Sequence, residues 1–502
     1  MSQVTHNLIA NFAARGWYAL ITFAFVPLYI HFLGMEAYGL VGFYATLQAL
    51  FGLLDFGLGA TINRQLARYS VQPEKAGEAG DLVRTLEIGY WALGITIGAT
   101  VLLLSPAIAN HWVNAEKLDA ATVQSMVMLM GGIIALQWPF NLYAGGLRGL
   151  QRQVLLSGLT IGSATLRGVG AILVLWLVSP TIEAFFWWQM AVGALQTAAC
   201  VFCLKFSLPK SGRKPRFRRD LLNTVWPFAS RMTVTSLLIL LLSQLDKVLL
   251  SKILPLELFG YYSVANTASS AVLLPMAPIS EALFPRLSQL VSEGDSTELQ
   301  RVFHHTCQLS ALALFPVASL ISLFSAPILF LWTGDPILSE RISLVTSLLA
   351  LGVALNYSVM GTLDLLQMAY GWLQPSLLSR LAALVLCGPI MTILAYSYGS
   401  VGVAVAWLAI YVGYAMLTPH FVFRRLMVGD KARWYVKDVL SPMLVAFSTA
   451  ALWRFSIPIP MDKAGMLLYL AAALAMVCIA VAVSMAQTRQ MLKIVARKLG
   501  GG

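Results

Sequence analysis

Five basic side chains lie within stretches of apolar sequence that are long enough to cross a lipid bilayer. They are Arg15, Arg167, Arg231, Lys247 and Arg380. A charge near the bilayer centre is costly, so residues that stay there usually face a cavity or a partner. Arginine offers a fork of N–H donors that fits phosphate and carboxylate oxygens. This surplus of cations predicts binding of an anionic ligand rather than a cationic one. The alternative is that individual members only hold helices together.

Distance along the helices separates the five cations. At a rise of about 1.5 Å per residue, Arg15 and Arg231 lie about 10 to 12 Å inside the cytoplasmic boundary. Arg167 is expected near the midplane, and Lys247 in the outer third. Arg380 lies about one turn into its helix, where it can snorkel to the lipid headgroups. A structural role is therefore the preferred interpretation for Arg380.

Acidic residues inside or at the ends of the same stretches are candidates for binding a coupling cation or for pairing with the basic residues. Asp55, within LLDFGLGA, is placed most deeply. Asp246 adjoins Lys247, but neighbours on a helix point about 100° apart and need not pair. A structural ion pair or a role at a helix end is an equally good interpretation for each acid. The full set is Asp55, Glu87, Asp246, Glu281 and Asp364.

The sequence contains no constellation that predicts catalysis or a metal centre. The six His residues show no HExxH or comparable spacing, although His304 and His305 adjoin a helix start. The five Cys residues lie in or beside apolar stretches and are interpreted as small buried hydrophobes. No Walker A sequence is present, so ATP hydrolysis is not expected. We therefore predict no enzyme activity, no catalytic residue and no metal ligand.

The elements that must position these charges are membrane-spanning helices. The 502 residues are 58% hydrophobic and 11% charged, whereas soluble domains average about 25% charged residues. A bilayer core of about 30 Å needs about 20 apolar residues per helix. Stretches of this length predict an all-α polytopic membrane protein with about fourteen spans. They cover residues 8–33, 37–61, 86–110, 122–145, 153–178, 183–204, 223–251, 259–284, 303–332, 342–362, 375–397, 401–422, 438–456 and 464–486.

The basic residues between the spans predict the orientation, because Lys and Arg near the ends of short loops resist translocation. Most of the 34 basic residues fall in segments that lie inside if the N-terminus is cytoplasmic. The outside segments hold Lys117, Lys252, Arg341, Arg454 and Lys463. Both termini are therefore predicted to be cytoplasmic. Topology rather than nucleic-acid binding explains the net charge of +12.

An internal repeat predicts two six-helix lobes related by a pseudo-twofold axis along the membrane normal. Residues 12–15 (FAAR) correspond to 228–231 (FASR), and Tyr38–Gly39 corresponds to Phe259–Gly260. Glu36 and Glu257 precede the second pair. Two further arginines close the matched helices at their cytoplasmic ends and are candidates for a cytoplasmic gate: Arg64 and Arg286.

The repeat and the longest basic loop together predict the domain organisation. An N-lobe at 1–204 is followed by a basic cytoplasmic linker at 205–222 and a C-lobe at 223–422. Residues 423–502 add two further helices and a basic cytoplasmic tail. The end of that tail, TRQMLKIVARKLGGG, is basic and amphipathic and is expected to lie along the cytoplasmic membrane surface. A frayed helix end is an equally good interpretation.

Three segments resemble the multidrug/oligosaccharidyl-lipid/polysaccharide (MOP) exporter superfamily, and more closely its Wzx-type polysaccharide flippases. They are FLGMEAYGL (32–40), LLDFGLGATINRQLAR (53–68) and ALFPRLSQL (282–290). The resemblance covers nearly the whole chain. It implies two lobes that alternate between inward-open and outward-open states around a cationic cavity. It places ligand binding on Arg15 and Arg231, with Arg167 and Lys247 as further members.

The resemblance also implies what such a chain would handle. Its expected cargo is an undecaprenyl-diphosphate-linked oligosaccharide, the repeat unit of O-antigen or exopolysaccharide, moved across a bacterial inner membrane. Membrane lipids, a polysaccharide polymerase and a chain-length regulator are expected partners. No cofactor is expected, and coupling to a proton or sodium gradient would fit.

Three other functions stay open at this stage. A lipid II flippase of the same superfamily also has fourteen helices and a cationic cavity. A multidrug antiporter shares the twelve-helix core but would be expected to present acids to cationic drugs. A membrane glycosyltransferase or ligase would normally carry a large outer loop with catalytic carboxylates or His, whereas the outside loops here are short.

Overall fold

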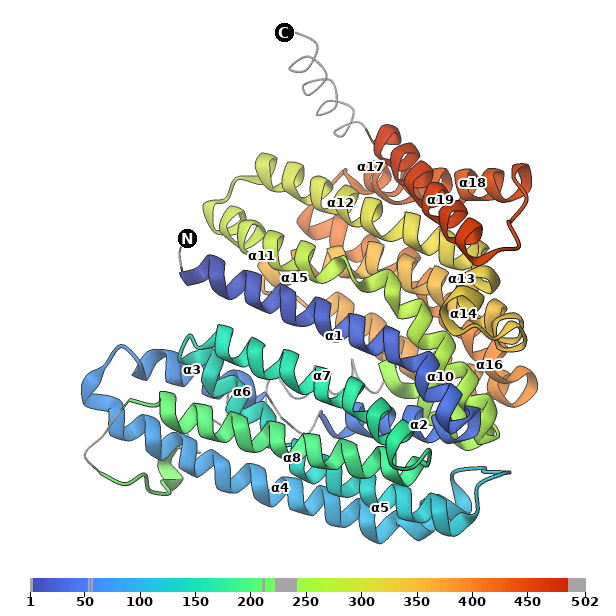
Figure 1. The fold of residues 1–502 in the computed structure, drawn as a ribbon. Coiled ribbons are helices and arrows are strands. Elements are labelled where there is room, and N and C mark those ends of the chain that lie inside the picture. The colour runs from blue at the N-terminus through green and yellow to red at the C-terminus, as the bar shows by residue number, and fades with distance from the viewer. Residues whose placement is uncertain (1–2, 53–54, 56, 210–212, 222–241, 486–502) are drawn as a thin grey trace, which may run out of the picture. The chain divides into compact units, whose positions relative to one another are not determined.

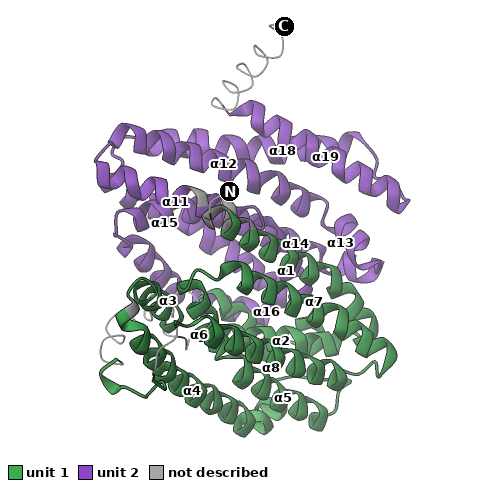
Figure 2. Cartoon of the chain, turned by 60° about the vertical axis from the view of Figure 1, so that its left-hand side comes forward, with its two compact units in different colours: residues 1–260 green, residues 261–502 purple. Residues whose placement is uncertain are grey.

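The computed structural model is mostly helical in the part of the chain that it describes, which is residues 3–485 without 53, 54, 56, 210–212 and 222–241 (Figure 1). The chain divides into two compact units, residues 1–260 and 261–502 (Figure 2). The expected all-α polytopic class is confirmed. The predicted domain boundaries stay predictions, and most of the expected span 223–251 lies outside the described residues.

Unit 1 contains the described helices α1 to α8, a further helical segment at 242–253 and the first residues of α10. Long helices α4 and α5 pack together, as do α1 with α7 and α7 with α8 (Figure 1). Side chains cap the starts of α5 and α8. The Asp119 carboxylate accepts from the backbone N–H of Thr122, and the Thr181 hydroxyl accepts from the backbone N–H of Ala184. The helices are α1 (Gln3–Leu33), α2 (Met35–Gly52), α3 (Leu58–Tyr69), α4 (Ala76–His111), α5 (Ala120–Gln137), α6 (Phe140–Gly149), α7 (Gln153–Leu177), α8 (Ile182–Ser207) and α10 (Leu256–Ser270).

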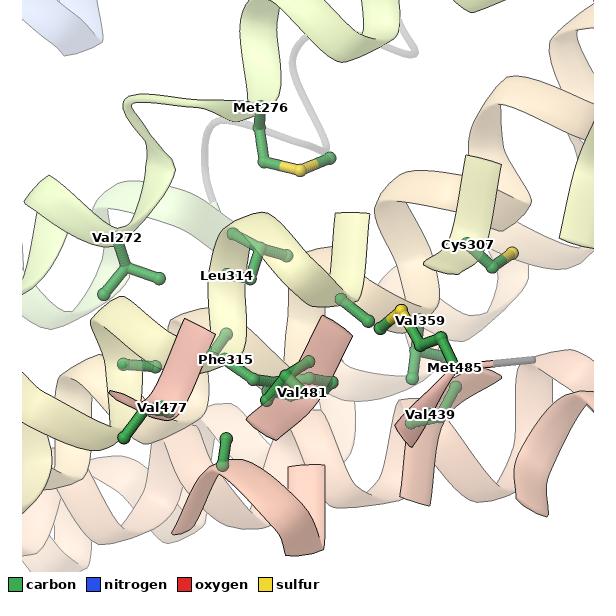
Figure 3. Close-up of a cluster of buried hydrophobic side chains, with 14 of the residues drawn as sticks. Val272, Met276, Cys307, Leu314, Phe315, Val359, Val439, Val477, Val481 and Met485 are labelled. Atoms are coloured by element: carbon green, nitrogen blue, oxygen red, sulfur yellow. The ribbon is translucent and has the colours of Figure 1, made fainter. Parts of the chain in front are cut away.

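Unit 2 is built around α12, which packs against α11, α14, α18 and α19. Figure 3 shows its apolar core, where Val477 and Val481 of α19 lie near Leu314 and Phe315 of α12. The elements are α11 (Met276–Glu293), α12 (Ser296–Leu323), α13 (Ser325–Thr333), α14 (Pro336–Asn356), the π-helical turn η4 (Tyr357–Gly361), α15 (Thr362–Ala369), α16 (Gln374–Leu426), α17 (Lys431–Arg433), the π-helical turn η5 (Trp434–Leu440), α18 (Ser441–Ser456) and α19 (Lys463–Ser484).

Ten of the described helical segments are long and apolar enough to cross a membrane. One of them, α16, contains 53 residues, which is about 80 Å of helix and far more than one crossing needs. Gly399 interrupts it with φ 57° and ψ −136°, a backbone conformation open to glycine. The predicted spans 375–397 and 401–422 lie on the two sides of this break.

Several predicted spans contain breaks that hydropathy alone does not reveal. The stretch predicted at 37–61 is α2 followed by α3, with Gly57 in a left-handed conformation before α3. The stretch predicted at 342–362 ends in the wide turn η4, which continues into α15. A hydropathy window averages over these turns, because the residues on both sides are equally apolar.

Candidate functional site

Arg167 is held within a polar network inside unit 1. Its Nη2 donates to Oε1 of Gln196 on α8 at 2.9 Å. The hydroxyl of Tyr44 on α2 lies near the guanidinium. Its backbone oxygen accepts from the hydroxyl of Tyr29 on α1 at 3.4 Å and from Gln189 Nε2 at 3.5 Å. Side chains from three other helices therefore surround this residue.

The network continues into a small cavity with amide groups in its wall. Gln48 Nε2 donates to the Tyr44 hydroxyl at 2.6 Å and to Oε1 of Gln137 at 3.0 Å. The cavity has a volume of about 170 Å³ and is also lined by Asn141 and Gln196. An amide carries two donors and an acceptor, so these side chains can bind hydroxyl groups, water or anion oxygens.

The recorded hydrogen-bond acceptor of the Arg167 guanidinium is an uncharged amide. Among the residues that the structure describes, no carboxylate forms an ion pair with it, and its side-chain acceptor is the Gln196 amide. A cation in a membrane-spanning helix is stabilised by neighbouring dipoles, and an anion in the adjoining cavity would stabilise it further. The cavity and the guanidinium together are suited to a ligand that combines hydroxyl groups with negative charge.

Arg380 in unit 2 has a different environment. Its guanidinium pairs with the Asp364 carboxylate at 2.5 Å. The other Asp364 oxygen accepts from the Ser376 hydroxyl at 2.6 Å, and Ser376 accepts from Gln367 at 2.7 Å. The pair joins α15 to the first turns of α16. Two of the residues singled out from the sequence are thus brought together as partners of one another.

Asp55 lies at the start of α3 rather than in an ion pair that the structure records. One carboxylate oxygen accepts from the Tyr90 hydroxyl at 2.6 Å, and the other from the backbone N–H of Gly59 at 3.2 Å. A carboxylate that accepts a backbone N–H at a helix start stabilises that helix end. Asp55 therefore ties α3 to α4.

The Asp246 and Lys247 side chains approach one another in the helical segment 242–253. Nζ of Lys247 lies 3.5 Å from Oδ2 of Asp246 and 3.5 Å from the backbone oxygen of Ser243. Asp246 is buried and Lys247 is half-buried. Although neighbours on a helix need not pair, the long lysine side chain bends back to reach this carboxylate.

The remaining candidates are distributed over both units. Arg15 is exposed on α1. One turn earlier on the same helix, the Asn11 amide donates to Gln153 on α7 at 2.8 Å. Arg64 on α3 is exposed, as are Glu281 and Arg286 on α11. Arg231 lies outside the described residues. The ligand-binding and gate roles of these side chains stay predictions.

The described part of the basic linker is docked on α4. The Asp81 carboxylate, which is fully buried, accepts from the Arg213 guanidinium at 2.6 Å and from the Arg216 backbone N–H at 2.8 Å. Glu87, one turn and a half further along α4, pairs with Arg84 at 2.9 Å and Lys205 at 3.1 Å. These acids hold cations of the linker, of α8 and of α4 itself, and among the described residues neither acid is paired with Arg167.

Sequence reasoning missed the function of the two glutamates of the internal repeat. Glu36 accepts from the backbone N–H of Lys117 at 2.9 Å, and the Lys117 ammonium pairs with Glu257 at 2.5 Å. The repeat-related glycines meet at the same place: a Cβ on Gly39 would lie 2.3 Å from the Leu256 backbone oxygen. We name Glu36, Lys117, Glu257, Gly39 and Gly260 the glutamate–glycine clasp.

The clasp is reciprocal, as the repeat would require. A Cβ on Gly260 would lie 2.5 Å from the Met35 backbone oxygen, which mirrors the contact of Gly39 with Leu256. The two glycines that the repeat relates, Gly39 and Gly260, therefore lie where the backbones of α2 and α10 approach closely. The sequence does contain the repeat that pairs Tyr38–Gly39 with Phe259–Gly260. A repeat, however, does not indicate that its two copies are in contact.

A family model described as "Polysaccharide biosynthesis protein" matches residues 4–291, which is more than half of the chain. The chain belongs to the polysaccharide biosynthesis protein family. A second model, MatE, matches residues 232–394. The resemblance to the MOP exporter superfamily is thereby confirmed, and this polysaccharide biosynthesis family member is a multi-pass membrane transporter.

Relatives of this family member agree with that assignment. A Shigella flexneri protein described as "Putative O-antigen transporter" is 23% identical over 383 residues, which cover 75% of this chain and 87% of that protein. The structure is similar to the lipid II flippase MurJ in an inward closed conformation, with TM-score 0.70 and 12% identity, over 97% of this chain and 99% of that chain.

The fold extends to drug transporters of the same superfamily. An inward-facing multidrug resistance MATE family transporter superposes with TM-score 0.68 and 13% identity, over 81% of this chain and 95% of that chain. At these identities the similarity shows the shared fold alone. The cargo of the polysaccharide biosynthesis family member has to be argued from its own residues.

Proposed function

We propose that this protein is a flippase that moves undecaprenyl-diphosphate-linked oligosaccharide repeat units, of O-antigen or exopolysaccharide, from the cytoplasmic to the periplasmic leaflet by alternating access. The observation that carries the proposal is Arg167, a cation that the described structure leaves without a carboxylate and whose acceptor, Gln196, lines a cavity walled by amide groups. An oligosaccharide diphosphate offers the matching chemistry of hydroxyl groups with negative charge.

The residues suggest how the headgroup would be carried. A phosphate or acidic-sugar oxygen accepts from the Arg167 guanidinium, and sugar hydroxyls exchange hydrogen bonds with the Gln48, Gln137 and Asn141 amides. These contacts replace the water that the headgroup loses on entering the protein. Arg15 and Arg231 supply further positive charge, while the polyprenyl tail stays in the bilayer. The chain carries out no covalent chemistry in this scheme.

The proposal includes the setting in which the flippase works. The protein lies in the bacterial inner membrane with both termini in the cytoplasm, as the basic loops predict. A proton or sodium gradient drives the return of the empty carrier. A polysaccharide polymerase and a chain-length regulator receive the flipped repeat units on the periplasmic side.

The test is a deletion strain that is complemented with wild type or with Arg167→Gln. Wild type should clear undecaprenyl-diphosphate-linked repeat units that accumulate in the deletion strain, measured by mass spectrometry of extracted lipids. Arg167→Gln should leave them accumulated by at least about tenfold, because a hydrogen bond to a charged group contributes about 1.5 to 3 kcal/mol. Arg341→Gln, which changes an arginine at a predicted outside loop, is the matched control and should clear them.

The two other transport functions give different results in the same strains. Accumulation of lipid II with growth arrest would indicate a lipid II flippase, to which the fold is similar. Unchanged lipid intermediates together with sensitivity to cationic drugs would indicate a drug antiporter. Full clearance by Arg167→Gln in membranes that contain the protein would contradict the assigned ligand site.

A further inference from the structure

A second cluster of titratable groups lies in unit 2, apart from the pair of Asp364 and Arg380. Both ring nitrogens of His304, on α12, face carboxylates: Nδ1 contacts Asp438, and Nε2 lies 3.0 Å from Oδ2 of Asp430. The exposed fraction of the His304 side chain is 2%, that of Asp438 is 1% and that of Asp430 is 15%. The three residues are named the histidine–aspartate triad.

The geometry determines how many protons the ring needs. A neutral imidazole has one N–H donor and one lone pair, whereas the imidazolium ion donates from both nitrogens. With a carboxylate at each nitrogen, a neutral ring would direct a lone pair at a negative oxygen inside a buried site. The other Asp438 oxygen already accepts from Gln308 Nε2 at 2.8 Å. The arrangement is therefore complete only when His304 carries a second proton.

The other charged groups near the triad do not replace the second proton on His304. The Arg433 guanidinium lies 4.0 Å from the outer oxygen of Asp430 and is largely exposed. Lys431 is directed to His420 at 3.2 Å, and Arg301 pairs with Glu298 at 2.8 Å. Charged groups on the other elements packed against α12 are engaged elsewhere or exposed. Arg341 lies over Tyr261, Arg454 over Phe324 and Lys463 over Phe330, and Asp364 pairs with Arg380. The exposed groups are Glu281, Arg286, Glu293, Glu340 and Lys437, and His305, the next residue of α12, is half-buried.

The triad fastens one particular segment. Asp430 directly precedes α17 and Asp438 lies within η5, in the stretch that leads from α16 into the C-terminal helices α18 and α19. Within that stretch Trp434 is fully buried, and its Nε1 donates to Sγ of Cys307 at 3.3 Å. Cys307 and Val439 of η5 both belong to the apolar core shown in Figure 3. The segment is thus held by a polar attachment at His304 and an apolar one beside Cys307.

We propose that the histidine–aspartate triad is a buried proton-binding site that fastens residues 430–440 to α12, so that loss of the proton releases the segment leading into the two C-terminal helices. The ligand is a proton exchanged with water. When it leaves His304, two carboxylates remain around a neutral ring, and separation of the segment from α12 relieves their repulsion. The docked form binds the proton and the released form does not, so acid favours docking and alkali favours release.

Cys307 is a built-in reporter of the docked state, because Trp434 covers its thiol. The experiment uses full-length protein in liposomes in which Cys200, Cys203, Cys387 and Cys478 are replaced by Ala. The rate of Cys307 alkylation by N-ethylmaleimide is measured by mass spectrometry from about pH 6 to about pH 9. His304→Gln, which cannot take up a positive charge and has both of its donors on a single nitrogen, is measured in parallel so that the intrinsic pH dependence of the thiol cancels in the ratio of rates.

At about pH 6 we expect Cys307 to react at least about tenfold more slowly in the protein that retains His304 than in His304→Gln. The two rates should converge toward about pH 9. Arg301→Gln, an exposed change one turn earlier on α12, should behave as the unaltered protein. Equal rates at pH 6, or a ratio that stays constant over the whole range, would overturn the proposal.

Asp430→Asn supplies a second measurement that does not require the His304→Gln protein to fold. Asp430 is the least buried member of the triad, and its replacement removes one carboxylate while keeping the shape of the side chain. The proton should then be held less tightly, so the pH at which Cys307 becomes reactive should fall. An unchanged pH midpoint would overturn the assignment of the proton to His304.

Discussion

Arg167 in unit 1 and Arg380 in unit 2 are the same residue type within long apolar helices, but they have different neighbours. Arg167 donates to an amide, Gln196, beside a cavity. Arg380 is neutralised by the Asp364 carboxylate, which Ser376 also binds. An arginine inside the membrane is thus not by itself evidence of ligand binding. The identity of its acceptor separates a charge available to a ligand from one that joins two helices.

The largest effect is expected from giving Arg167 the kind of partner that Arg380 has. Gln196→Glu places a carboxylate at the position of the present amide acceptor, so the guanidinium is neutralised and no longer attracts an anion. Accumulation of lipid-linked repeat units should rise by at least about tenfold while the folded yield in membranes is maintained. Gln196→Met, which removes the acceptor without adding charge, should have a smaller effect on accumulation. Normal clearance by Gln196→Glu would remove the proposed distinction between the two arginines.

The converse change makes Arg380 resemble Arg167. Asp364→Asn leaves the guanidinium in a partly buried site without its counter-charge, and we expect a loss of about 3 kcal/mol in the free energy of unfolding. Thermal unfolding of the purified protein in detergent would report it as a lower midpoint. Adding Arg380→Gln should recover part of the loss, because no unpaired charge remains. A midpoint unaffected by Asp364→Asn would show that the pair contributes no stability.

The smallest effect concerns a feature that the two halves of the repeat share. Gly39→Ala would bring a Cβ into the Leu256 backbone oxygen at the glutamate–glycine clasp, and overpacking of this kind costs about 1 to 3 kcal/mol. Gly16→Ala is the matched control, because nothing lies within 4 Å of a Cβ at that position. The midpoint of thermal unfolding should fall for the first variant and remain or rise for the second. Equal midpoints would mean that the repeat-related contact can relax.

Much of the fold follows from the sequence because hydropathy sets where a chain can cross a bilayer. The predicted stretches 153–178 and 183–204 correspond closely to α7 and α8. The breaks inside other stretches could not be placed, since Gly57 and Gly399 act through their backbone dihedral angles and leave the mean hydropathy unchanged. A wide turn such as η4 is equally invisible in composition.

The residue types of the site could be predicted from the sequence, but the hydrogen-bond and ion-pair partners of those residues could not. Arg167, Asp364 and Arg380 stood out because charges are rare in apolar stretches, yet their acceptors depend on how the helices pack. The histidine–aspartate triad was missed for a related reason, since His304 and Asp438 are 134 residues apart and neither breaks a span. Only the three-dimensional arrangement shows that both ring nitrogens of one histidine meet carboxylates.

The backbone of Gly399 also affects how sequence variation in this family should be interpreted. Its dihedral angles, φ 57° and ψ −136°, belong to a region that side chains with a Cβ rarely enter. Glycine should therefore persist at this position in relatives that carry very different cargoes. Invariance there would record the break between two spans, and a search for specificity determinants should exclude it. Variation at Gln48, Gln137 and Asn141, by contrast, would be the variation that follows the sugar.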